Sequence, residues 1–497
     1  MTVRRLVCRN IADGTGAELF SGRITIDNHY ITAVERGDFA VESASDAFYD
    51  ENVIVCPAFI DAHGHSDLSL LAMPDAAGKT AQGIGWEVSG NCGLSPFPLT
   101  ERNREHLQEL YAQYGIELDW HDYTSYMQKV QQCRPAMDLF PLTGHNTLRA
   151  AVAGYEKKHL SCEETAQMLD LLDAQLQAGS PGISFGLLYV PGCFAEFEEI
   201  VSLMKVVARH NKLAAVHLRS EGNDLEGAID EMISAARAAG LKKLHLSHLK
   251  TSGLANFHKI SFIEKALQSP DICVTGDVYC YDASMTQLSV IMPEGFDKFD
   301  DITLQHKLAD EKFFQQVLPK VQASRPPEYW QRVRLLSLPD EYKHLSGQLL
   351  PEAAQKMNHS IGELYLNILK SNAAMATAAY HTLSRENMEK LAAMEKVVPG
   401  SDESARSTTT RFGSSHPRGF GNHAEYFALR QSQGAEYSKI IAEMTGKPAQ
   451  IFNLPQVGCI APNHRARLTI LDPEKYQARA TYEKPHQTAT GAELVIY

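Results

Sequence analysis

Apolar and polar residues alternate with a period of two near both ends of the chain. In residues 22–35, Ile24 and Ile26 begin a series of apolar positions two apart, the repeat of a half-buried strand. Residues 466–471 form a similar run closed by Asp472-Pro473, and residues 492–497 form another. Two β-rich ends around a long middle predict one small β-domain built from residues 1–57 and 420–497.

The middle of the chain alternates between short apolar runs and longer amphipathic stretches. The apolar runs, typical of buried strands, include residues 53–65, 212–222, 242–250, 271–281 and 395–402. Between them, stretches such as 162–179 and 224–240 have a helical repeat and end at glycine. This alternation predicts a parallel α/β fold. Candidate functional residues follow the strand runs, which favours a (β/α)8 barrel over residues 58–419. A doubly wound sheet should carry a glycine-rich turn after its first strand, and this chain has His63-Gly64-His65 there.

Residues 285–342 fit neither pattern. They combine a strongly charged stretch with a lone Trp330. A long insertion after a barrel strand is often a lid over the active site, so we expect an inserted lid here. A surface decoration is the alternative.

Potential metal ligands follow the ends of several predicted strands: His63, His65, Cys92, His217, His248 and Asp402. Residues two apart in a strand face the same side, so His63 and His65 can point into one cavity. The same repeat puts His248 and Lys250 on one face, towards the barrel mouth, and His245 on the other, towards the helices. Imidazole, thiolate and carboxylate are zinc ligands, and a catalytic zinc keeps one position open for water. No C-x2-C pair occurs, so the ligands should come from different strands, although Cys92 alone would also suit an apolar core.

A serine-hydrolase motif is matched at residues 182–186, GISFG, but in the wrong context. The nucleophile elbow is a turn from a strand into a helix. Here a helical pattern precedes the motif and a strand-like run follows it. The serine-hydrolase interpretation is therefore rejected.

A set of short motifs in a fixed order marks a family resemblance. They are PAFIDAHGHSD at 57–67, GNCG at 90–93, GHNTLR at 144–149, HLR at 217–219, SHLK at 247–250, GSD at 400–402 and HPR at 416–418. With them the chain resembles the N-acyl-D-amino-acid deacylases (D-aminoacylases) of the amidohydrolase superfamily over nearly its whole length. The resemblance implies a zinc-dependent barrel enzyme with a small β-sandwich that releases a free D-amino acid from its N-acyl derivative.

The resemblance also implies roles for individual residues. It places a tightly held zinc on Cys92, His217 and His248, and a second, weaker metal on His63 and His65 beside a catalytic Asp402. It assigns the substrate carboxylate to Lys250, Tyr281 and Arg418, a pocket wall to Tyr189, and a further site position to His145. Family members selective for D-glutamate carry an arginine at the start of the lid, whereas residues 291–294 here are IMPE. A neutral or hydrophobic substrate side chain is therefore expected.

The net charge and the cysteine content limit the expected classes of partner and the expected cellular compartment. Forty-seven Lys and Arg against sixty Asp and Glu give a formal net charge of −13, which argues against nucleic acid as the main partner. No apolar stretch is long enough for a membrane helix, and residues 1–14 do not form a signal peptide. Nine scattered cysteines suit a reducing cytoplasm. The expected partner is a small N-acyl amino acid, with a homo-oligomer also compatible.

Two other functions stay open at this stage. One is a cyclic amidohydrolase of the dihydroorotase or hydantoinase kind, which usually bridges two metals with a carbamylated lysine; no convincing lysine for this role is found. The other is a barrel that has lost its metal and serves as a scaffold, although every candidate ligand is present.

Overall fold

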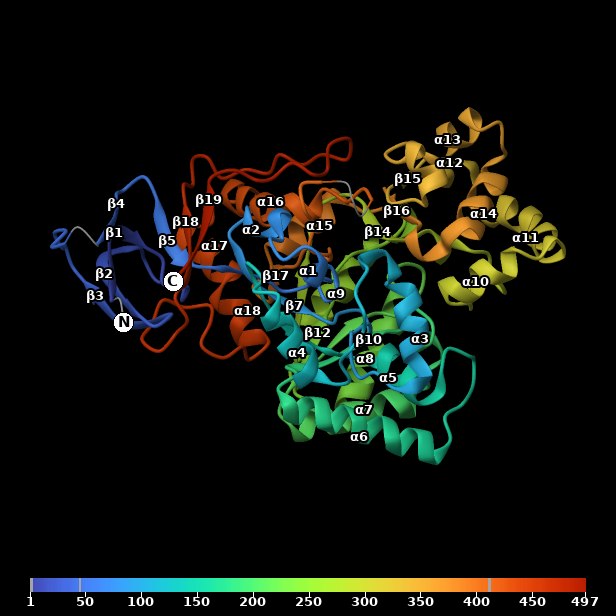
Figure 1. The fold of residues 1–497 in the computed structure, drawn as a ribbon, viewed down its shortest axis with the longest axis horizontal. Coiled ribbons are helices and arrows are strands. Elements are labelled where there is room, and N and C mark those ends of the chain that lie inside the picture. Colours follow the sequence, from blue (N-terminus) through green and yellow to red (C-terminus); the bar gives the residue numbers. More distant parts are fainter. Residues whose placement is uncertain (1–2, 44–45, 410–412) are drawn as a thin grey trace.

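A parallel barrel forms the centre of the molecule (Figure 1). The computed structural model describes residues 3–43, 46–409 and 413–497. The barrel strands are β6 (Phe59–Asp61), β7 (Ile84–Ser89), β8 (Asp138–Pro141) continued by β9 (Thr143–Gly144), β10 (Gly182–Gly186), β11 (Leu213–His217), β12 (Lys243–Leu246), β13 (Cys273–Val278) and β17 (Val397–Pro399). They pair in parallel in the orders β6-β7-β8 and β9-β10-β11-β12-β13-β17. The amide of Ala62 donates to Pro399 across the remaining seam at 3.2 Å. The predicted α/β barrel is confirmed.

Amphipathic helices surround these strands (Figure 1). They are α3 (Glu101–Leu110), α4 (Tyr123–Gln132), α5 (His145–Ala153), α6 (Cys162–Ala178), α7 (Phe197–Arg209), α8 (Leu225–Ala239), α9 (Ile260–Leu267) and α15 (Arg385–Ala392), with the short α1 (Ser69–Ala72) and α2 (Ala77–Thr80) after β6. Local sequence sets their ends: Ser161 and Glu164 form a capping box at the start of α6, and Gly240 in the left-handed region ends α8. None of the helices in the described residues is long and apolar enough to cross a membrane.

A separate sheet joins the two ends of the chain. Its order is β19-β18-β5-β1-β2-β3, with β4 pairing β1. The strands are β1 (Arg4–Ile11), β2 (Phe20–Asp27), β3 (Tyr30–Arg36), β4 (Ala47–Tyr49), β5 (Ile54–Pro57), β18 (Arg467–Leu471) and β19 (Ala492–Ile496). Figure 1 shows β18 and β19 beside β5, so the C-terminal chain completes a sheet begun at the N-terminus.

The C-terminal part of this sheet begins later than residue 420, where the sequence pattern set the boundary. Residues 418–451 instead form three helices, α16 (Arg418–Ser432), α17 (Tyr437–Met444) and α18 (Gly446–Ile451). Their apolar side chains, including Tyr426, Ile440 and Met444, are buried with the helices of the barrel. Burial of these apolar faces keeps the segment on the barrel, and the sheet takes up the chain only at Arg467.

The insertion forms a unit with its own apolar core, at the far side of the barrel from the N-terminal sheet (Figure 1). It runs from β14 (Ser284–Gln287) to β16 (Thr377–Tyr380), so it continues past residue 342. Its other elements are β15 (Val333–Leu335), α10 (Asp301–Leu308), α11 (Glu311–Ser324), α12 (Pro327–Trp330), α13 (Leu350–Lys356) and α14 (Ile361–Asn372). Trp330 and Tyr365 pack together inside this unit, with ring centroids 6.1 Å apart. One face of α14 is buried there, which is why residues beyond 342 belong to the insertion.

Candidate active site

A cavity of about 450 Å³ opens where the barrel strands end. Its walls come from the loops after the strands and from the insertion, including Met285, Gln287 and Tyr380. Parallel barrel enzymes build their sites at this end of the strands. The cavity is therefore the candidate active site.

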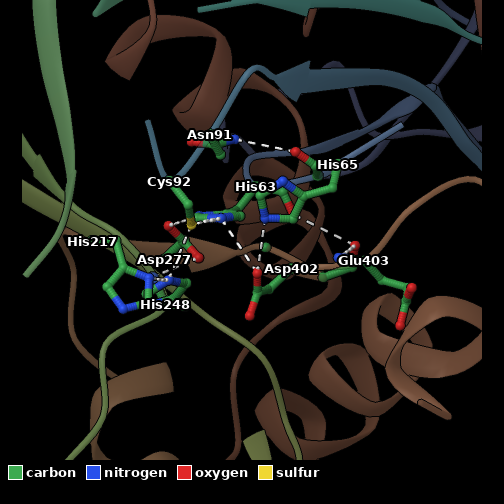
Figure 2. Close-up of polar contacts among 12 residues, drawn as sticks. His63, His65, Asn91, Cys92, His217, His248, Asp277, Asp402 and Glu403 are labelled. Carbon is green, nitrogen blue, oxygen red and sulfur yellow. Dashed lines mark hydrogen bonds and ion pairs between the residues drawn. The ribbon is translucent and has the colours of Figure 1, made fainter. Parts of the chain in front are cut away.

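Four side chains from different strand ends meet beside the cavity (Figure 2). Sγ of Cys92 lies 3.4 Å from Nε2 of His63 and 3.4 Å from Nε2 of His248. Nε2 of His63 lies 3.5 Å from Oδ1 of Asp402. In a tetrahedral zinc site with bonds of 2.0–2.3 Å, neighbouring ligand atoms are about 3.3–3.8 Å apart. The four atoms lie within 4.8 Å of one another and have the spacing of a metal site.

His217 and Glu221 extend this cluster. Nδ1 of His217 lies 2.8 Å from Nε2 of His248, and Oε1 of Glu221 lies 2.9 Å from Nδ1 of His248. His217, Glu221 and His248 form a second group with metal-ligand spacing. The sequence reading missed Glu221; an acidic residue four positions after a strand-ending histidine was the available signal.

His65 completes the histidine pair. Its Nε2 lies 3.1 Å from Oδ1 of Asp402, and its ring borders the cavity. The ring of His63 is fully buried, and its Nδ1 faces Asp277 at 3.2 Å. Both histidines thus contact the same carboxylate oxygen of Asp402, as Figure 2 shows.

Asp277 is a second acidic residue that sequence reasoning missed. It is buried in β13, and its Oδ2 also lies 3.0 Å from Nε2 of His245 while its Oδ1 accepts the amide of His248. His245 therefore faces the barrel interior, where its ring packs on Phe452, and the predicted orientation towards the helices is wrong. The period of two does not extend to His248, because β12 ends at Leu246 and His248 has a φ of +35°. A charged residue inside an apolar strand was the sequence signal for Asp277.

Three of the clustered residues have a left-handed backbone. The φ angles are +52° at Cys92, +35° at His248 and +51° at Asp402. For residues with a Cβ, such conformations cost of order 1–3 kcal/mol and concentrate at functional sites. The strained backbone thus occurs at three positions whose side chains all point towards the same centre.

Two cations stand on the cavity wall near Asp402. Nη1 of the buried Arg418 lies 3.0 Å from Oδ2 of Asp402, and Lys250 donates to Oε1 of Glu221 at 2.7 Å. The ring of Tyr279 lies 4.7 Å from Cζ of Arg418 and 5.6 Å from Nζ of Lys250. Tyr279 lies behind the cavity lining of the described chain, and its buried hydroxyl has no hydrogen-bond partner among the described residues.

The other predicted site residues have different surroundings. Tyr189 borders the cavity, and its hydroxyl lies 3.1 Å from the hydroxyl of Thr286 in the insertion. The hydroxyl of Tyr281 donates to the carbonyl of Pro417 at 3.4 Å, outside the cavity lining found in the described chain. His145 is buried, with Nε2 2.7 Å from Glu199, and also lies outside that lining. The structure does not bring His145 to the cluster.

The electrostatics of the cluster fit a bound cation. Burial and the neighbouring Asp402 raise the pKa of the Cys92 thiol well above its usual value, so the sulfur needs a cation beside it to ionise. Burial alone would raise the pKa of Asp402, but Arg418 and the imidazoles lower it by a larger amount. The pKa of this carboxyl therefore lies well below the usual range. Burial lowers the pKa of His63, which favours the neutral imidazole that a metal requires. Sulfur, imidazole and carboxylate together form a donor set suited to zinc.

Comparisons with known proteins give homologues over nearly the whole chain. No protein-family model matches. The chain is 28% identical over 494 residues to the N-acyl-D-glutamate deacylase of Alcaligenes xylosoxydans xylosoxydans, covering 98% of this chain and 90% of that protein. It is 27% identical over 465 residues to the D-aminoacylase of the same organism, covering 92% and 86%. A solved N-acyl-D-glutamate deacylase from Bordetella bronchiseptica, in complex with zinc and a phosphonate mimic of the tetrahedral intermediate, has a TM-score of 0.81, 25% identity and coverage of 99% and 95%.

The fold, the ligand cluster and these relatives define the chain as a metal-dependent amidohydrolase. Its homologues are the N-acyl-D-amino-acid deacylases, and the resemblance stated from the sequence is confirmed. The zinc prediction is confirmed as well, by the zinc complex of a structural neighbour and by the Cys, His and Asp groups of this chain.

Proposed function

We propose that the protein hydrolyses the amide bond of N-acyl-D-amino acids to a free D-amino acid and a carboxylate. The observation that carries this proposal is the position of Arg418, which lies 3.0 Å from Asp402 on the same cavity wall as the ligand cluster. A cation for the substrate carboxylate thus lies next to the group proposed to handle the proton.

The proposed metal ligands come from five strand ends. Cys92, His217 and His248 would hold one zinc tightly, and His63, His65 and Asp402 would offer a second, weaker position. When bound, zinc lowers the pKa of a water molecule and polarises the amide carbonyl. Glu221 and Asp277 keep the ligand imidazoles oriented through hydrogen bonds to their second nitrogens, as outer carboxylates do in metal sites.

Asp402 is the proposed proton carrier. Its low pKa keeps it ionised at neutral pH, so it can accept the proton of the attacking water and then deliver it to the departing amine nitrogen. The side chain is 12% exposed at the cavity, within reach of a bound substrate. The alternative is that Asp402 acts only as a metal ligand. The metal content of an Asp402 variant distinguishes the two roles.

The side chains proposed to bind the substrate carboxylate are Arg418 and Lys250. The tyrosine beside both cations is Tyr279. A guanidinium can bind a carboxylate through two parallel hydrogen bonds, which fixes its orientation. With the carboxylate on one side and the acyl carbonyl on the metal, the side chain of the amino acid has one direction left. The geometry would then select one enantiomer.

The wall contributed by the insertion supports a neutral or hydrophobic substrate side chain. Among the described cavity-lining residues, the insertion supplies apolar side chains such as Met285, Val290 and Ile291, uncharged polar ones such as Thr286 and Gln287, and no Lys or Arg. Two arginines elsewhere in the lining are paired: Arg219 with Glu231 at 3.0 Å and Arg406 with Glu403 at 3.4 Å.

A stereochemical screen tests the proposal. Zinc-loaded enzyme is assayed with N-acetyl-D- and N-acetyl-L-forms of leucine, methionine and glutamate, and with dihydroorotate and hydantoin. We expect turnover of the D-leucine and D-methionine derivatives and little of the others. Preference for the L-forms or for the ring substrates would refute the proposed function, and preference for D-glutamate would refute only the side-chain assignment.

A further inference from the structure

A fully buried lysine lies behind the ligand cluster and is not part of the proposed chemistry. We propose that Lys79 is a positioning residue that holds the His63–His65 segment and the Asp402 segment at the spacing at which they share a cation. The effect on turnover rests on the proposed function, whereas the effect on metal binding does not.

Lys79 has four oxygen acceptors from three separate segments of the chain. Its Nζ donates to Oδ2 of Asp61 at 2.7 Å and to Oε2 of Glu87 at 2.5 Å. It also donates to Oγ of Ser401 at 3.1 Å and to the carbonyl oxygen of Glu403 at 2.8 Å. The last two contacts lie on either side of Asp402. Three of the four therefore involve β6 or the loop after β17.

Asp61 and Glu87 carry these contacts on to the histidine pair. Oδ1 of Asp61 accepts the amides of His63 at 3.2 Å and Ser401 at 2.8 Å. Glu87 accepts both the amide and the hydroxyl of Ser66, directly after His65, at 2.9 and 2.6 Å. One ammonium group thus fixes both carboxylates that hold the ends of the His63–His65 segment.

The two segments also pair with each other directly in front of Lys79. The amide of Asp402 donates to the carbonyl of His63 at 2.7 Å, and the amide of His65 donates to that of Glu403 at 3.1 Å. Gly64 lies between them, and a Cβ there would stand 2.0 Å from Cδ of Glu87. The Glu87 carboxylate therefore packs directly against the backbone at Gly64. Because of this contact, a shift of Glu87 would also move His63 and His65, which lie on either side of Gly64.

Helix α2 links this arrangement to the start of α16, where Arg418 lies. Gln82, just after α2, donates to the carbonyl of Gly419 at 3.2 Å and accepts the amide of His423 at 2.9 Å. Lys79 therefore lies on a helix that packs on α16, while its ammonium reaches the residues that hold the histidine pair and those on either side of Asp402. Supporting contacts of this kind typically change metal affinity or activity by about 10–100-fold when removed.

The test compares Lys79→Met with a matched buried cation away from the site. Arg430 on α16 is buried and pairs with Glu443 at 3.0 Å, so Arg430→Met removes a similar interaction and serves as the control. The measurements on full-length protein are the affinity for the second metal from titration with zinc, the zinc stoichiometry after dialysis, the visible absorption spectrum of the cobalt(II)-substituted protein, and kcat and KM separately.

For Lys79→Met we expect the second metal, at His63, His65 and Asp402, to be held at least about 10-fold more weakly, an altered cobalt spectrum, and kcat at least about 10-fold lower with a smaller change in KM. Arg430→Met should lose thermal stability but keep the metal content and spectrum. Because a buried carboxylate pair without its cation is itself destabilising, Lys79→Met/Glu87→Gln serves as a second variant with the charge balance restored. It should regain stability but not the wild-type spectrum or kcat.

Wild-type metal content, cobalt spectrum and kcat in Lys79→Met would overturn the proposal, as would full recovery in the double variant. If neither variant folds, Ser401→Ala removes one bridging hydroxyl without changing charge, and unchanged metal binding in it would also overturn the proposal. The metal measurements need no substrate. A wild-type protein inactive on N-acyl-D-amino acids would therefore refute the proposed function and leave this test intact.

Discussion

Nη1 of Arg418 lies 3.0 Å from Oδ2 of Asp402, and both side chains border the cavity that contains the ligand cluster. The guanidinium therefore has two proposed roles: it pairs with Asp402, the proposed proton carrier, and it binds the substrate carboxylate. Both roles lead to predictions.

The first concerns substrate binding. Arg418→Met should lower kcat/KM for an N-acetyl-D-amino acid by about 30-fold or more, since losing one partner of a buried charge pair costs about 2–5 kcal/mol. The same substrate with its carboxylate replaced by a primary amide should be hydrolysed equally by both proteins at a pH above the acid limb of each. A loss of similar size on the amide would show that Arg418 does not bind the carboxylate.

The second concerns the pH profile of the same variant. Burial raises the pKa of Asp402, and Arg418 contributes strongly to its net lowering. Without Arg418 the pKa of Asp402 rises, and because the ionised form is the active one, the acid limb of kcat/KM should move to higher pH. Profiles of both proteins at constant ionic strength measure this shift, and an unmoved acid limb would contradict it.

Asp402→Asn separates the two possible roles of this residue. If Asp402 carries the proton, turnover should fall by about 100-fold or more while the tightly held zinc is retained. Zinc stoichiometry after gel filtration, measured beside initial rates, gives the answer. Loss of that zinc together with activity would instead favour a role as ligand.

Two tyrosines near the cations can be distinguished by removing their hydroxyls. The hydroxyl of Tyr279 is buried without a described partner next to Arg418, whereas that of Tyr281 contacts Pro417. We expect Tyr279→Phe to raise KM by about 10-fold or more, because a hydrogen bond to a charged group contributes about 1.5–3 kcal/mol. Tyr281→Phe is the matched comparison, and the larger effect in that variant would restore the assignment made from the sequence.

The insertion should show its own pH dependence of stability. Burial raises the pKa of Asp301, in the first turn of α10, to about 6, although a hydrogen bond from Ser289 opposes this. The folded-state pKa lies above the unfolded value of about 4, so ionisation destabilises the fold as pH rises through 6 and has no effect well below 4. Asp301→Asn should stabilise the protein by about 1–2 kcal/mol at pH 8 and little at pH 4. Thermal unfolding at both pH values checks this, with the exposed Asp340→Asn as control.

Much of the site could be predicted because polar residues stand where apolar strands end. His63, His65, Cys92, His217, His248 and Asp402 all follow such runs, and the barrel places strand ends together. The direction in which these side chains point was harder to predict from the sequence. The left-handed backbone at His248 resets the alternation along its segment, and a periodic pattern cannot contain that information.

The supporting residues were harder to find. Asp61, Glu87 and Asp277 are single acidic residues inside otherwise apolar strands, and Lys79 lies on a helix of four residues. Each is individually unremarkable in sequence, since only their contacts across the barrel show that they pair. The extent of the insertion was hidden for a similar reason: an amphipathic helix has the same pattern whether it packs on the barrel or, like α14, on a separate core.

The insertion leaves and re-enters the barrel at one place, because β14 and β16 are antiparallel partners with Gln287 opposite Thr377. Its wall of the cavity is therefore joined to the catalytic scaffold through a narrow neck. Recombination between relatives at this neck can replace the residues proposed to meet the substrate side chain in a single genetic event. New selectivity would then evolve while the chemistry beneath it is inherited unaltered.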